Sequence, residues 1–499
     1  IRRRMAWQCE GGCGWGQRRN RAVTVWPMDA TARYQLRHSN GRQETAWRTS
    51  GEGSMRKTKV AIVGLGTVGS GVARLLLDHG DRTARHAGRT LWLQKAVVRD
   101  LDKARGVDLP AGILTADVNE VYADPEIEVV AHLVGGLEPA RTILLRLLES
   151  GKDVVTANKA LLAEHGPELF AAARKLGRTI AFEASVAGGI PIITNISQCL
   201  SANSIESLEG ILNGTSNFIL TQMDRFGTPY GDAVAEAQRL GYAEADPAMD
   251  VDGTDAAQKL AILAHLAFGA QVAWQDIPRV GIEKLETDDL RYASQLGYAI
   301  KLLAEAKLVG DKLDLHVSPT LIKRRTPLAE VQDAFNAVRV VGDAVGPVFY
   351  HGQGAGQMPT ASAVVADLID TAVGRTRLTF ETLEPFSTAS PPRVSLRNSD
   401  ELPGRYYFRL QAKDHPGTLA AITGVFGKHR LSIASVIQHE RNGGGDADES
   451  AGGSVEQDIV PLVIMSHEGA EGSARAVAEE IESLGVVRGA VTRLRVKTP

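Results

Sequence analysis

Short apolar runs alternate with helical patterns between residues 58 and 156. The run at 58–63 (TKVAIV) is rich in β-branched residues, and apolar residues then recur at helical spacing from 68 to 76. Further strand-like runs lie at 91–98, 129–134 and 153–156, and a helical pattern covers 139–149. Because strands alternate with helices, the sequence predicts a parallel, doubly wound sheet of the α/β class.

The pattern changes near residue 186. A strand-like run at 205–213 (IESLEGILN) has the character of a strand in a different sheet, and helices and strands then follow in no regular alternation. The predicted helices are 215–225, 231–240 and 254–268, and the predicted strands are 280–285 and 307–317. A Gly-rich turn at 352–356 then opens a long helix. We therefore expect a second domain of the α+β class.

The C-terminal part is separated by a segment rich in Ser and Pro, which predicts a linker. Beyond it, a β-α-β, β-α-β pattern predicts a small ferredoxin-like domain, interrupted by a mobile hairpin-type loop at 442–457. The expected bounds are an extension at 1–54, a first domain at 55–185 completed by about 341–385, a second domain at 186–340, a linker at 386–404 and a third domain at 405–499.

Composition excludes several classes of protein. The chain has 499 residues, which is enough for about three domains. Its formal net charge of −3 argues against a general nucleic-acid-binding protein, which carries a basic face. No apolar run reaches the roughly 18–20 residues of a membrane span. Three cysteines are too few for a disulfide framework, so we expect a cytoplasmic protein.

Residues 1–54 differ in composition from the rest of the chain. They contain ten Arg, no Lys and four acidic residues, and they lack clear periodicity. Met55 stands before RKTKVAIVGLG and resembles a natural start, so we interpret this segment as disordered, translated upstream sequence without function. Cys9 and Cys13 are half of a zinc donor set, but no second Cys or His pair lies nearby, and we expect no zinc site.

A glycine-rich turn stands between the first predicted strand and helix. Its G-x-G-x-x-G pattern is formed by Gly64, Leu65, Gly66, Thr67, Val68 and Gly69. Glycines let backbone N–H groups approach a pyrophosphate at the N-terminus of a helix. The strand before the turn and the helix after it distinguish the motif from an ordinary turn. The sequence thus predicts a dinucleotide site in a Rossmann-type domain.

The end of the second predicted strand bears on the choice of nicotinamide cofactor. Arg99 follows the strand directly, and Lys103 lies four residues later, with Asp100 and Asp102 between them. Cationic side chains here suit the 2′-phosphate of NADP, whereas a carboxylate suits the ribose 2′-hydroxyl of NAD. We expect NADP, with NAD tolerated; a solvated charged turn is the alternative.

Five segments together resemble one known family. They are GLGTVGSGVARLL at the turn, TANKALLAEHG at 156–166, EASVAGGIPII at 183–193, NGTSNFIL at 213–220 and GYAEADPAMDVDGTDAAQKLAIL at 241–263. Their order and content resemble homoserine dehydrogenase over residues 57–385. The segment KDHPGTLAAITGVFGKHRLSIASVIQ resembles an ACT domain, and this pairing is similar to the common bacterial form of the enzyme.

The resemblance implies an NAD(P)-dependent oxidoreductase. The family interconverts L-aspartate 4-semialdehyde and L-homoserine by hydride transfer, at the branch point toward threonine, methionine and isoleucine. Two alternatives stay open: another semialdehyde or amino-acid oxidoreductase on the same scaffold, and an amino-acid-sensing ACT protein with an inactive dehydrogenase domain. The second alternative predicts loss of Lys159, Asp255 or Lys259, and all three are present.

Asp255 and Lys259 stand four residues apart on a predicted helix, so their side chains share one face. By resemblance, Lys259 is the acid/base of the reaction and Asp255 its partner; alternatively, Lys259 polarises the carbonyl while a water carries the proton. Lys159 follows a strand end, where open α/β sheets bind ligands. The resemblance places Lys159 beside the nicotinamide and the substrate, where it is a second candidate for the proton donor. A surface ion pair and a loop lysine are the structural alternatives.

The substrate, an amino acid, has an ammonium and a carboxylate to be bound. By resemblance, Glu244 and Asp250 hold the ammonium, and the backbone around Asn213, Gly214 and Thr215 receives polar groups of the substrate.

The same acidic stretch invites comparison with a calcium loop. With Gly253 at the sixth position of an EF-hand loop, Ala248 is first and Lys259 twelfth, where Asp and Glu are needed. Both ends fail, so the calcium loop is rejected. Asp246 and Asp252 receive no role, and we expect them in a solvated turn.

The resemblance also implies a monovalent-cation site. The carboxylate of Glu183 and the carbonyls of Val186, Gly188 and Ile190 correspond to the family's sodium ligands, and a Gly-rich hinge is the alternative. Gly356 precedes a predicted helix, and we expect the chain to return to the cofactor there; an ordinary loop without a role in binding is the alternative.

In the ACT-like segment, the turn at 414–419 (DHPGTL) is expected to lie near a small-ligand site between paired domains. Threonine is the expected feedback inhibitor, and a purely structural or dimerising role is the alternative. We expect a homo-dimer or homo-tetramer.

Overall fold

The computed structural model describes residues 56–387, 394–438 and 459–497. Three predictions lie outside these residues: the extension at 1–54, the cysteine pair Cys9 and Cys13 within it, and the loop at 442–457. Among the described residues, no helix is long and apolar enough to cross a membrane.

The first sheet has six strands, and every pair of neighbouring strands is parallel. The strand order is β3-β2-β1-β4-β5-β6. The strands are β1 (Lys57–Val63), β2 (Thr90–Val97), β3 (Leu114–Thr115), β4 (Ile127–His132), β5 (Asp153–Thr156) and β6 (Ile180–Ala181). β1 is buried on both faces, as its apolar run predicted, because helices cover both sides of a parallel sheet.

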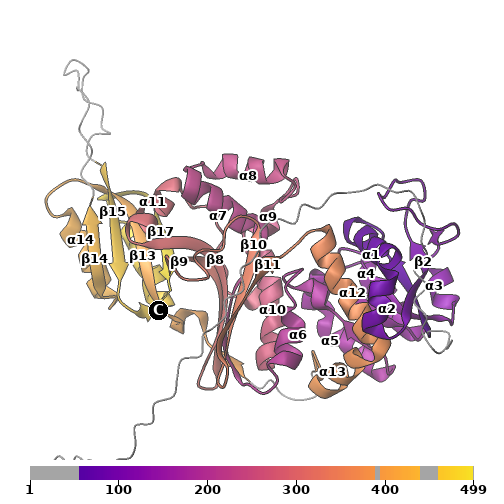
Figure 1. Ribbon diagram of the computed structural model, residues 1–499. Coiled ribbons are helices and arrows are strands. Elements are labelled where there is room, and N and C mark those ends of the chain that lie inside the picture. The colour runs from indigo at the N-terminus through magenta and orange to yellow at the C-terminus, as the bar shows by residue number, and fades with distance from the viewer. Residues whose placement is uncertain (1–55, 388–393, 439–458, 498–499) are drawn as a thin grey trace, which may run out of the picture. The chain divides into compact units, whose positions relative to one another are not determined.

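Among the described residues, seven helices pack around this sheet: α1 (Thr67–Asp78), α2 (Gly80–Ala87), α3 (Asn119–Ala123), α4 (Ala140–Glu149), α5 (Lys159–Lys175), α12 (Gln357–Val373) and α13 (Arg375–Leu383). Figure 1 shows α12, which comes late in the chain, beside the early helix α1. The contact is close because a Cβ on Gly71 would lie 2.9 Å from the Cβ of Ala361. The chain thus returns to the first domain near its glycine-rich turn.

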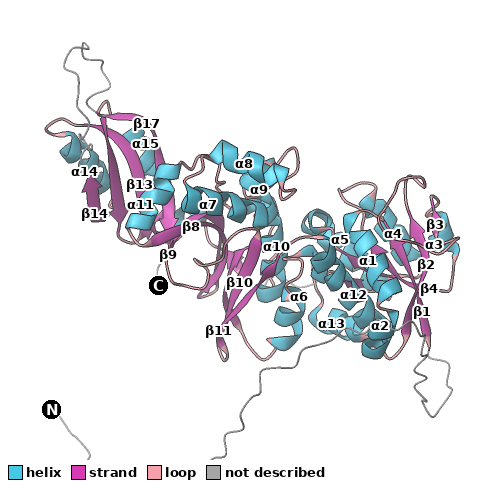
Figure 2. Ribbon diagram, turned by 45° about the horizontal axis from the view of Figure 1, so that its top comes forward, coloured by secondary structure: helices cyan, strands magenta, loops and turns pink. Residues whose placement is uncertain are grey.

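The second sheet is built from the middle and the end of the chain and has the order β11-β10-β7-β8-β9-β17-β13-β15-β14, with β12 beside β9 and β16 beside β13. Figure 2 shows its strands in magenta. The strands of the middle domain are β7 (Ile205–Ile211), β8 (Tyr298–Val309), β9 (Lys312–Lys323), β10 (Phe335–Gly342) and β11 (Gly346–Gln353). The helices of this domain are α6 (Ile192–Thr194), α7 (Gly214–Phe226), α8 (Tyr230–Arg239), α9 (Ala248–Val251), α10 (Thr254–Phe268) and α11 (Thr287–Gln295), with short helical turns at Glu183–Ser185, Asn195–Cys199 and Trp274–Asp276.

The C-terminal domain has the order of a ferredoxin-like fold, β17-β13-β15-β14, with antiparallel pairs throughout. Its elements are β13 (Pro403–Lys413), α14 (Thr418–Lys428), β14 (Ile433–Gln438), β15 (Ile459–Ser466), β16 (Gly469–Ala470), α15 (Glu471–Glu482) and β17 (Val487–Val496), preceded by β12 (Ser395–Leu396) and a helical turn at Ser399–Glu401. β17 also pairs in parallel with β9 through Arg495–Thr320 and Val496–Leu321, which joins the two parts of the sheet.

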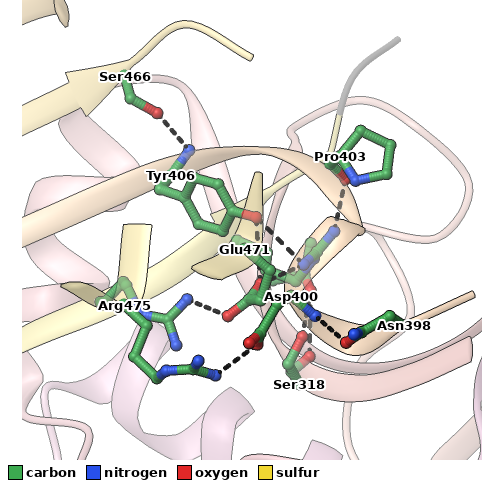
Figure 3. Close-up of polar contacts among 11 residues, drawn as sticks. Ser318, Asn398, Asp400, Pro403, Tyr406, Ser466, Glu471 and Arg475 are labelled. Carbon is green, nitrogen blue, oxygen red and sulfur yellow. Dashed lines mark hydrogen bonds and ion pairs between the residues drawn. The ribbon is translucent and has the colours of Figure 1, made fainter. Parts of the chain in front are cut away.

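A cluster of hydrogen bonds and ion pairs holds the first segment of the C-terminal domain against α15 and β17 (Figure 3). Glu471 accepts a hydrogen bond from the hydroxyl of Tyr406 at 3.1 Å and pairs with Arg493 and Arg495. Asp400, in the turn before β13, pairs with Arg475 on α15 at 2.8 Å.

Together, the two sheets and their helices confirm the architecture predicted from the sequence: an α/β domain, an α+β domain and a ferredoxin-like domain.

Three details of the middle domain differ from the prediction. The strand predicted at 280–285 is wrong: only an isolated bridge between Arg279 and Val317 forms there, and Ile282 and Leu285 are apolar because they are buried in the core. The single strand predicted at 307–317 is in fact parts of two strands: it covers the end of β8, the turn at 310–311 and the first half of β9. β11 also belongs to the second sheet, although the expected bound placed the return to the first domain at about 341.

Candidate active site

Two lysines from different domains meet one carboxylate. Asp255 lies in the first turn of α10, and Lys259 follows one turn later, with its Nζ 2.7 Å from Asp255 Oδ2. Lys159 is the first residue of α5, directly after β5, and its Nζ lies 3.2 Å from Asp255 Oδ1. Both residues of α10 are buried, whereas the Lys159 side chain keeps 38% of its surface exposed. The structure thus brings the three predicted catalytic residues together.

Burial and charge act in opposite directions on these groups. Burial alone raises the pKa of Asp255, but the ammonium groups of Lys259 and Lys159 and the donors around the carboxylate outweigh it and lower this pKa to about 2. The charge of Asp255 raises the pKa of Lys159 against the opposing effect of burial. Asp255 is therefore ionised and Lys159 cationic near neutral pH.

Asn213 connects this cluster with the predicted substrate residues. Its Oδ1 accepts from the N–H of Ser216 at 2.7 Å and so caps α7. Its Nδ2 donates to Asp250 Oδ1 at 2.7 Å and to Asp255 Oδ2 at 2.9 Å. Burial, as the largest cause, raises the pKa of Asp250, while the hydrogen bond from Asn213 opposes it. One amide thus fixes two carboxylates beside the start of a helix.

The remaining residues of the acidic stretch lie in different surroundings. The side chain of Glu244 is exposed. Asp246 accepts from the N–H of Ala248 at 3.1 Å at the start of α9, and Asp252 accepts from the N–H of Thr254 at 2.7 Å at the start of α10. Each of these two carboxylates thus accepts the N–H of the residue two positions later, within the turn that leads into the next helix.

The start of α7 is tightly packed. A Cβ on Gly214 would lie 2.7 Å from the carbonyl oxygen of Ala334, so only glycine fits. The hydroxyl of Thr215 donates to the carbonyl of Tyr242 at 2.7 Å, so it is held within the protein. A helix N-terminus favours anionic groups.

The glycine-rich turn has the geometry of a phosphate cradle. A Cβ on Gly69 would lie 2.2 Å from the carbonyl oxygen of Gly64, and one on Gly64 would lie 2.7 Å from that of Leu133. A Cβ on Gly66, by contrast, meets nothing within 4 Å. The side chain of Gln357, next to Gly356, donates to the carbonyl of Thr67 at 3.0 Å. The turn is therefore tightly packed at Gly64 and Gly69 and open at Gly66, at the N-terminus of α1, which fits a pyrophosphate.

Comparison with known proteins identifies the family. A model described as homoserine dehydrogenase matches residues 191–369, a model described as the NAD-binding domain of homoserine dehydrogenase matches 64–183, and an ACT-domain model matches 406–486. The homoserine dehydrogenase of Pseudomonas aeruginosa is 43% identical over 448 residues, which cover 89% of this chain and 99% of that protein. The chain belongs to the homoserine dehydrogenase family. It is therefore an oxidoreductase with a nicotinamide-binding domain.

Other homoserine dehydrogenases support this assignment. That of Bacillus subtilis is 38% identical over 443 residues, which cover 89% of this chain and 99% of that protein. The crystal structure of the Thiobacillus denitrificans enzyme superposes with a TM-score of 0.80 at 43% identity, over 89% of this chain and 99% of that chain. A hyperthermophilic archaeal homoserine dehydrogenase mutant, in complex with NADPH, superposes with a TM-score of 0.52 at 26% identity and covers 63% of this chain and 97% of that chain.

The loop that carries Arg99 and Lys103 also contains Arg105, a residue that the sequence analysis did not identify. The side chains of Arg99 and Lys103 are exposed. Arg105 donates to the carbonyl of Lys103 at 2.5 Å and to that of Asp100, so it folds the loop back on itself. No motif marks Arg105, and the only signal was the local density of positive charge.

Glu183 is buried in the helical turn Glu183–Ser185, and its carboxylate accepts three hydrogen bonds from residues of α6. They come from the N–H groups of Ile193 and Thr194, both at 2.8 Å, and from the Thr194 hydroxyl at 2.5 Å. Burial, as the largest cause, raises the pKa of Glu183. In the described part of the chain, no group of three or more His, Cys, Asp or Glu is arranged to hold a metal. The cation site expected from the homoserine dehydrogenase resemblance has one carboxylate, so its fit depends on backbone carbonyls.

The turn at 414–419 opens α14, as expected. Gly417 has a φ of 93°, which only glycine adopts readily, and it precedes the helix. Thr418 is buried, and its Oγ1 has no hydrogen-bond partner in the described structure. A buried hydroxyl without a partner is uncommon in native structures.

Proposed function

We propose that this chain interconverts L-aspartate 4-semialdehyde and L-homoserine by reversible hydride transfer, in the route to threonine, methionine and isoleucine. The observation that carries the proposal is the position of Asp255 between the ammonium groups of Lys259 and Lys159, at 2.7 and 3.2 Å. This arrangement argues against an inactive dehydrogenase domain, because nothing in a purely amino-acid-sensing protein requires it. Membership of the homoserine dehydrogenase family supports the choice of substrates.

The bound nicotinamide supplies or accepts the hydride. Lys259 directs two N–H bonds to Asp255 Oδ2 and to the carbonyl of Leu212, both at 2.7 Å, which leaves its third N–H for the substrate oxygen. In the direction of reduction, Lys259 gives a proton to the carbonyl oxygen as it becomes the hydroxyl of homoserine. In oxidation it removes that proton, directly or through one water. Asp255 stabilises the cationic form of Lys259 between turnovers.

Lys159 and the acidic residues orient the substrate. Because its pKa is raised, Lys159 stays cationic and stabilises negative charge that develops on the substrate oxygen. Glu244 and Asp250 bind the substrate ammonium, and Asp250 is held in place by Asn213. The backbone N–H groups at Gly214 and Thr215 receive the substrate carboxylate at the N-terminus of α7.

NADP is the proposed cofactor, with NAD accepted. Gly64 to Gly69 form the pyrophosphate cradle, Gly356 lies next to Gln357 at its edge, and the exposed Arg99 and Lys103 are free to pair with a 2′-phosphate. The archaeal relative in complex with NADPH supports this choice. We also propose that sodium binds between the Glu183 carboxylate and the carbonyls of Val186, Gly188 and Ile190.

Threonine is the proposed feedback inhibitor, bound at the ACT domain near the start of α14. A free amino acid has a carboxylate for the N-terminus of this helix and polar hydrogens for the unpartnered Oγ1 of Thr418. The protein is proposed to be cytoplasmic and to form a homo-dimer or homo-tetramer, in keeping with its family.

The test of the function is homoserine oxidation by the purified full-length protein. NADPH and NADH formation are followed by absorbance with NADP⁺ or NAD⁺, with and without threonine. We expect homoserine-dependent reduction of the cofactor, with a higher kcat/KM for NADP⁺ than for NAD⁺. We also expect threonine, but not alanine, to inhibit the reaction. A folded protein that binds NADPH but reduces neither cofactor in the presence of homoserine would contradict the function.

A further inference from the structure

Asn336 shares a hydrogen-bond acceptor with the proposed catalytic lysine. It lies on β10, is 1% exposed, and donates from Nδ2 to the carbonyl oxygen of Leu212 at 2.9 Å. Lys259 donates to the same oxygen at 2.7 Å. A carbonyl oxygen has two lone pairs, so these two donors occupy both. Asn336 and Lys259 are thus coupled through one backbone carbonyl.

The amide of Asn336 has one possible orientation. If its oxygen and nitrogen were exchanged, two oxygens would face each other and the carbonyl of Leu212 would lose a donor. In the orientation present, Oδ1 points away from Leu212 and has no hydrogen-bond partner in the described structure. Buried polar groups in native structures almost always have a partner, so this oxygen calls for an explanation.

Two glycines create the space for this amide. A Cβ on Gly354 would lie 2.0 Å from the Cγ of Asn336, and one on Gly214 would lie 3.4 Å from its Oδ1. Gly354 is in turn covered by Gly188, whose Cβ would lie 2.4 Å from the carbonyl oxygen of Gly354. Any side chain at Gly354 would displace the amide. The loop before α12, the start of α7 and the loop at Gly188 thus meet at Asn336.

We propose that Asn336 is a positioning residue of the reaction: it fixes the Leu212 carbonyl and thereby aims the free N–H of Lys259 at the substrate oxygen. The inference rests on the proposed function, since it acts through Lys259. This role explains why a polar side chain is buried on β10, next to Gly354 and Gly214, although its oxygen has no partner in the described structure. It also assigns Gly354 the role of making room for the amide.

Asn336→Asp tests the inference through a pH profile. A carboxylate at this position faces the Leu212 carbonyl without a proton to donate and lies close to the Lys259 ammonium, which stabilises the protonated lysine. In homoserine oxidation, where Lys259 must accept a proton, we expect the acidic limb of kcat/KM to move up by at least about one pH unit. We also expect kcat to fall at least about tenfold, while the Kd for NADPH, measured by fluorescence titration, stays within about twofold of wild type.

Asn217→Asp is the matched control. Asn217 is also 1% exposed and also donates to backbone carbonyls, those of Val331, Asp333 and Phe335, but it does not contact Leu212 or Lys259. Its variant should leave the acidic limb where it is in wild type. A limb that moves equally in both variants, or in neither, overturns the inference.

Asn336→Ala provides a second arm if the Asp variant does not fold. It removes the donor without adding charge, so kcat should fall several-fold while KM for homoserine and the acidic limb stay near wild type. An Asn336→Ala enzyme with wild-type kcat overturns the inference. These outcomes are distinct from failure of the proposed function, in which the wild-type enzyme itself would not oxidise homoserine.

Discussion

The guanidinium of Arg409, on β13 of the ACT domain, forms a buried ion pair with Asp289 on α11 of the middle domain. Arg409 Nε lies 2.6 Å from Asp289 Oδ1 and its Nη2 3.1 Å from Oδ2, and the two side chains are 6% and 0% exposed. The hydroxyl of Tyr407 donates to the same carboxylate at 3.3 Å. Since α11 packs on α7, this pair links the ACT domain to the helix whose N-cap, Asn213, donates to the active-site carboxylates of Asp250 and Asp255.

Asp289→Ala should destabilise the protein strongly, because it removes the buried carboxylate and leaves the Arg409 guanidinium with only the exposed carboxylate of Glu286 at 3.0 Å and the hydroxyl of Thr492 at 3.1 Å. The expected loss in the free energy of unfolding is about 3–5 kcal/mol. Thermal denaturation of the variant measures it. Asp288→Ala is the control, since Asp288 pairs with Arg291 on the surface at 2.9 Å and its loss should change stability by less than about 1 kcal/mol. Equal melting temperatures for the two variants would show that the buried pair contributes little.

The low pKa of Asp255 predicts how its contribution to stability depends on pH. Because the folded-state pKa, about 2, lies below the ordinary value of 3.8, the contribution is present above pH 3.8 and is lost as pH falls through about 2. Asp255→Asn should therefore lower the free energy of unfolding by about 2 kcal/mol at pH 7 and much less at pH 2. Denaturant titration at both pH values tests this. Asp246→Asn is the exposed control, and a pH-independent loss in Asp255→Asn would contradict the electrostatic account.

Gly66→Ala should separate folding from cofactor binding. In the structure a Cβ at Gly66 meets nothing within 4 Å, so the variant should fold with an unchanged melting temperature. The added methyl group occupies the space proposed for the pyrophosphate, and the affinity for NADPH should fall at least about tenfold. Gly80→Ala, which is equally unhindered and lies at the start of α2, should bind NADPH normally. Wild-type affinity in Gly66→Ala would place the pyrophosphate elsewhere.

His265 predicts a second pH dependence, at the end of α10. Its Nε2 accepts from the N–H of Phe386 at 2.5 Å and its Nδ1 donates to the carbonyl of Ala270 at 2.9 Å, so the ring must be neutral. Burial, as the largest cause, lowers the pKa of His265 below its ordinary 6.5. The stability that the neutral ring contributes is therefore present above pH 6.5 and is lost as pH falls through the lowered pKa. His265→Gln should flatten the decline in melting temperature below pH 6.5, and an unchanged slope would exclude this residue as its cause.

The helices of the site could be predicted closely from the sequence. The apolar pattern gave α10 its bounds at 254–268, because glycines with positive φ, Gly253 and Gly269, flank an uninterrupted helical periodicity. Lys159, Asp255 and Lys259 could be chosen because the family resemblance marks them, and the structure then placed them in contact. Local pattern is informative where the element itself is long and regular.

Contacts between distant residues could not be predicted. Asn336 is a buried polar residue on β10, a strand that the sequence analysis did not identify, and its partner Leu212 directly follows β7, far away in the sequence. The pairing of Arg409 with Asp289 depends on how two domains pack. The false strand at 280–285 has the same origin: Ile282 and Leu285 are apolar because they fill the core, and burial alone does not distinguish a strand from an irregular segment.

The central claim is that Lys259 transfers the proton that accompanies hydride transfer. The measurement that tests it most directly is the steady-state rate of homoserine oxidation by Lys259→Ala, together with its affinity for NADPH. The account predicts that kcat falls by at least about 100-fold, while the Kd for NADPH stays within about twofold of wild type. A Lys259→Ala enzyme that binds NADPH and retains near-normal kcat would contradict it.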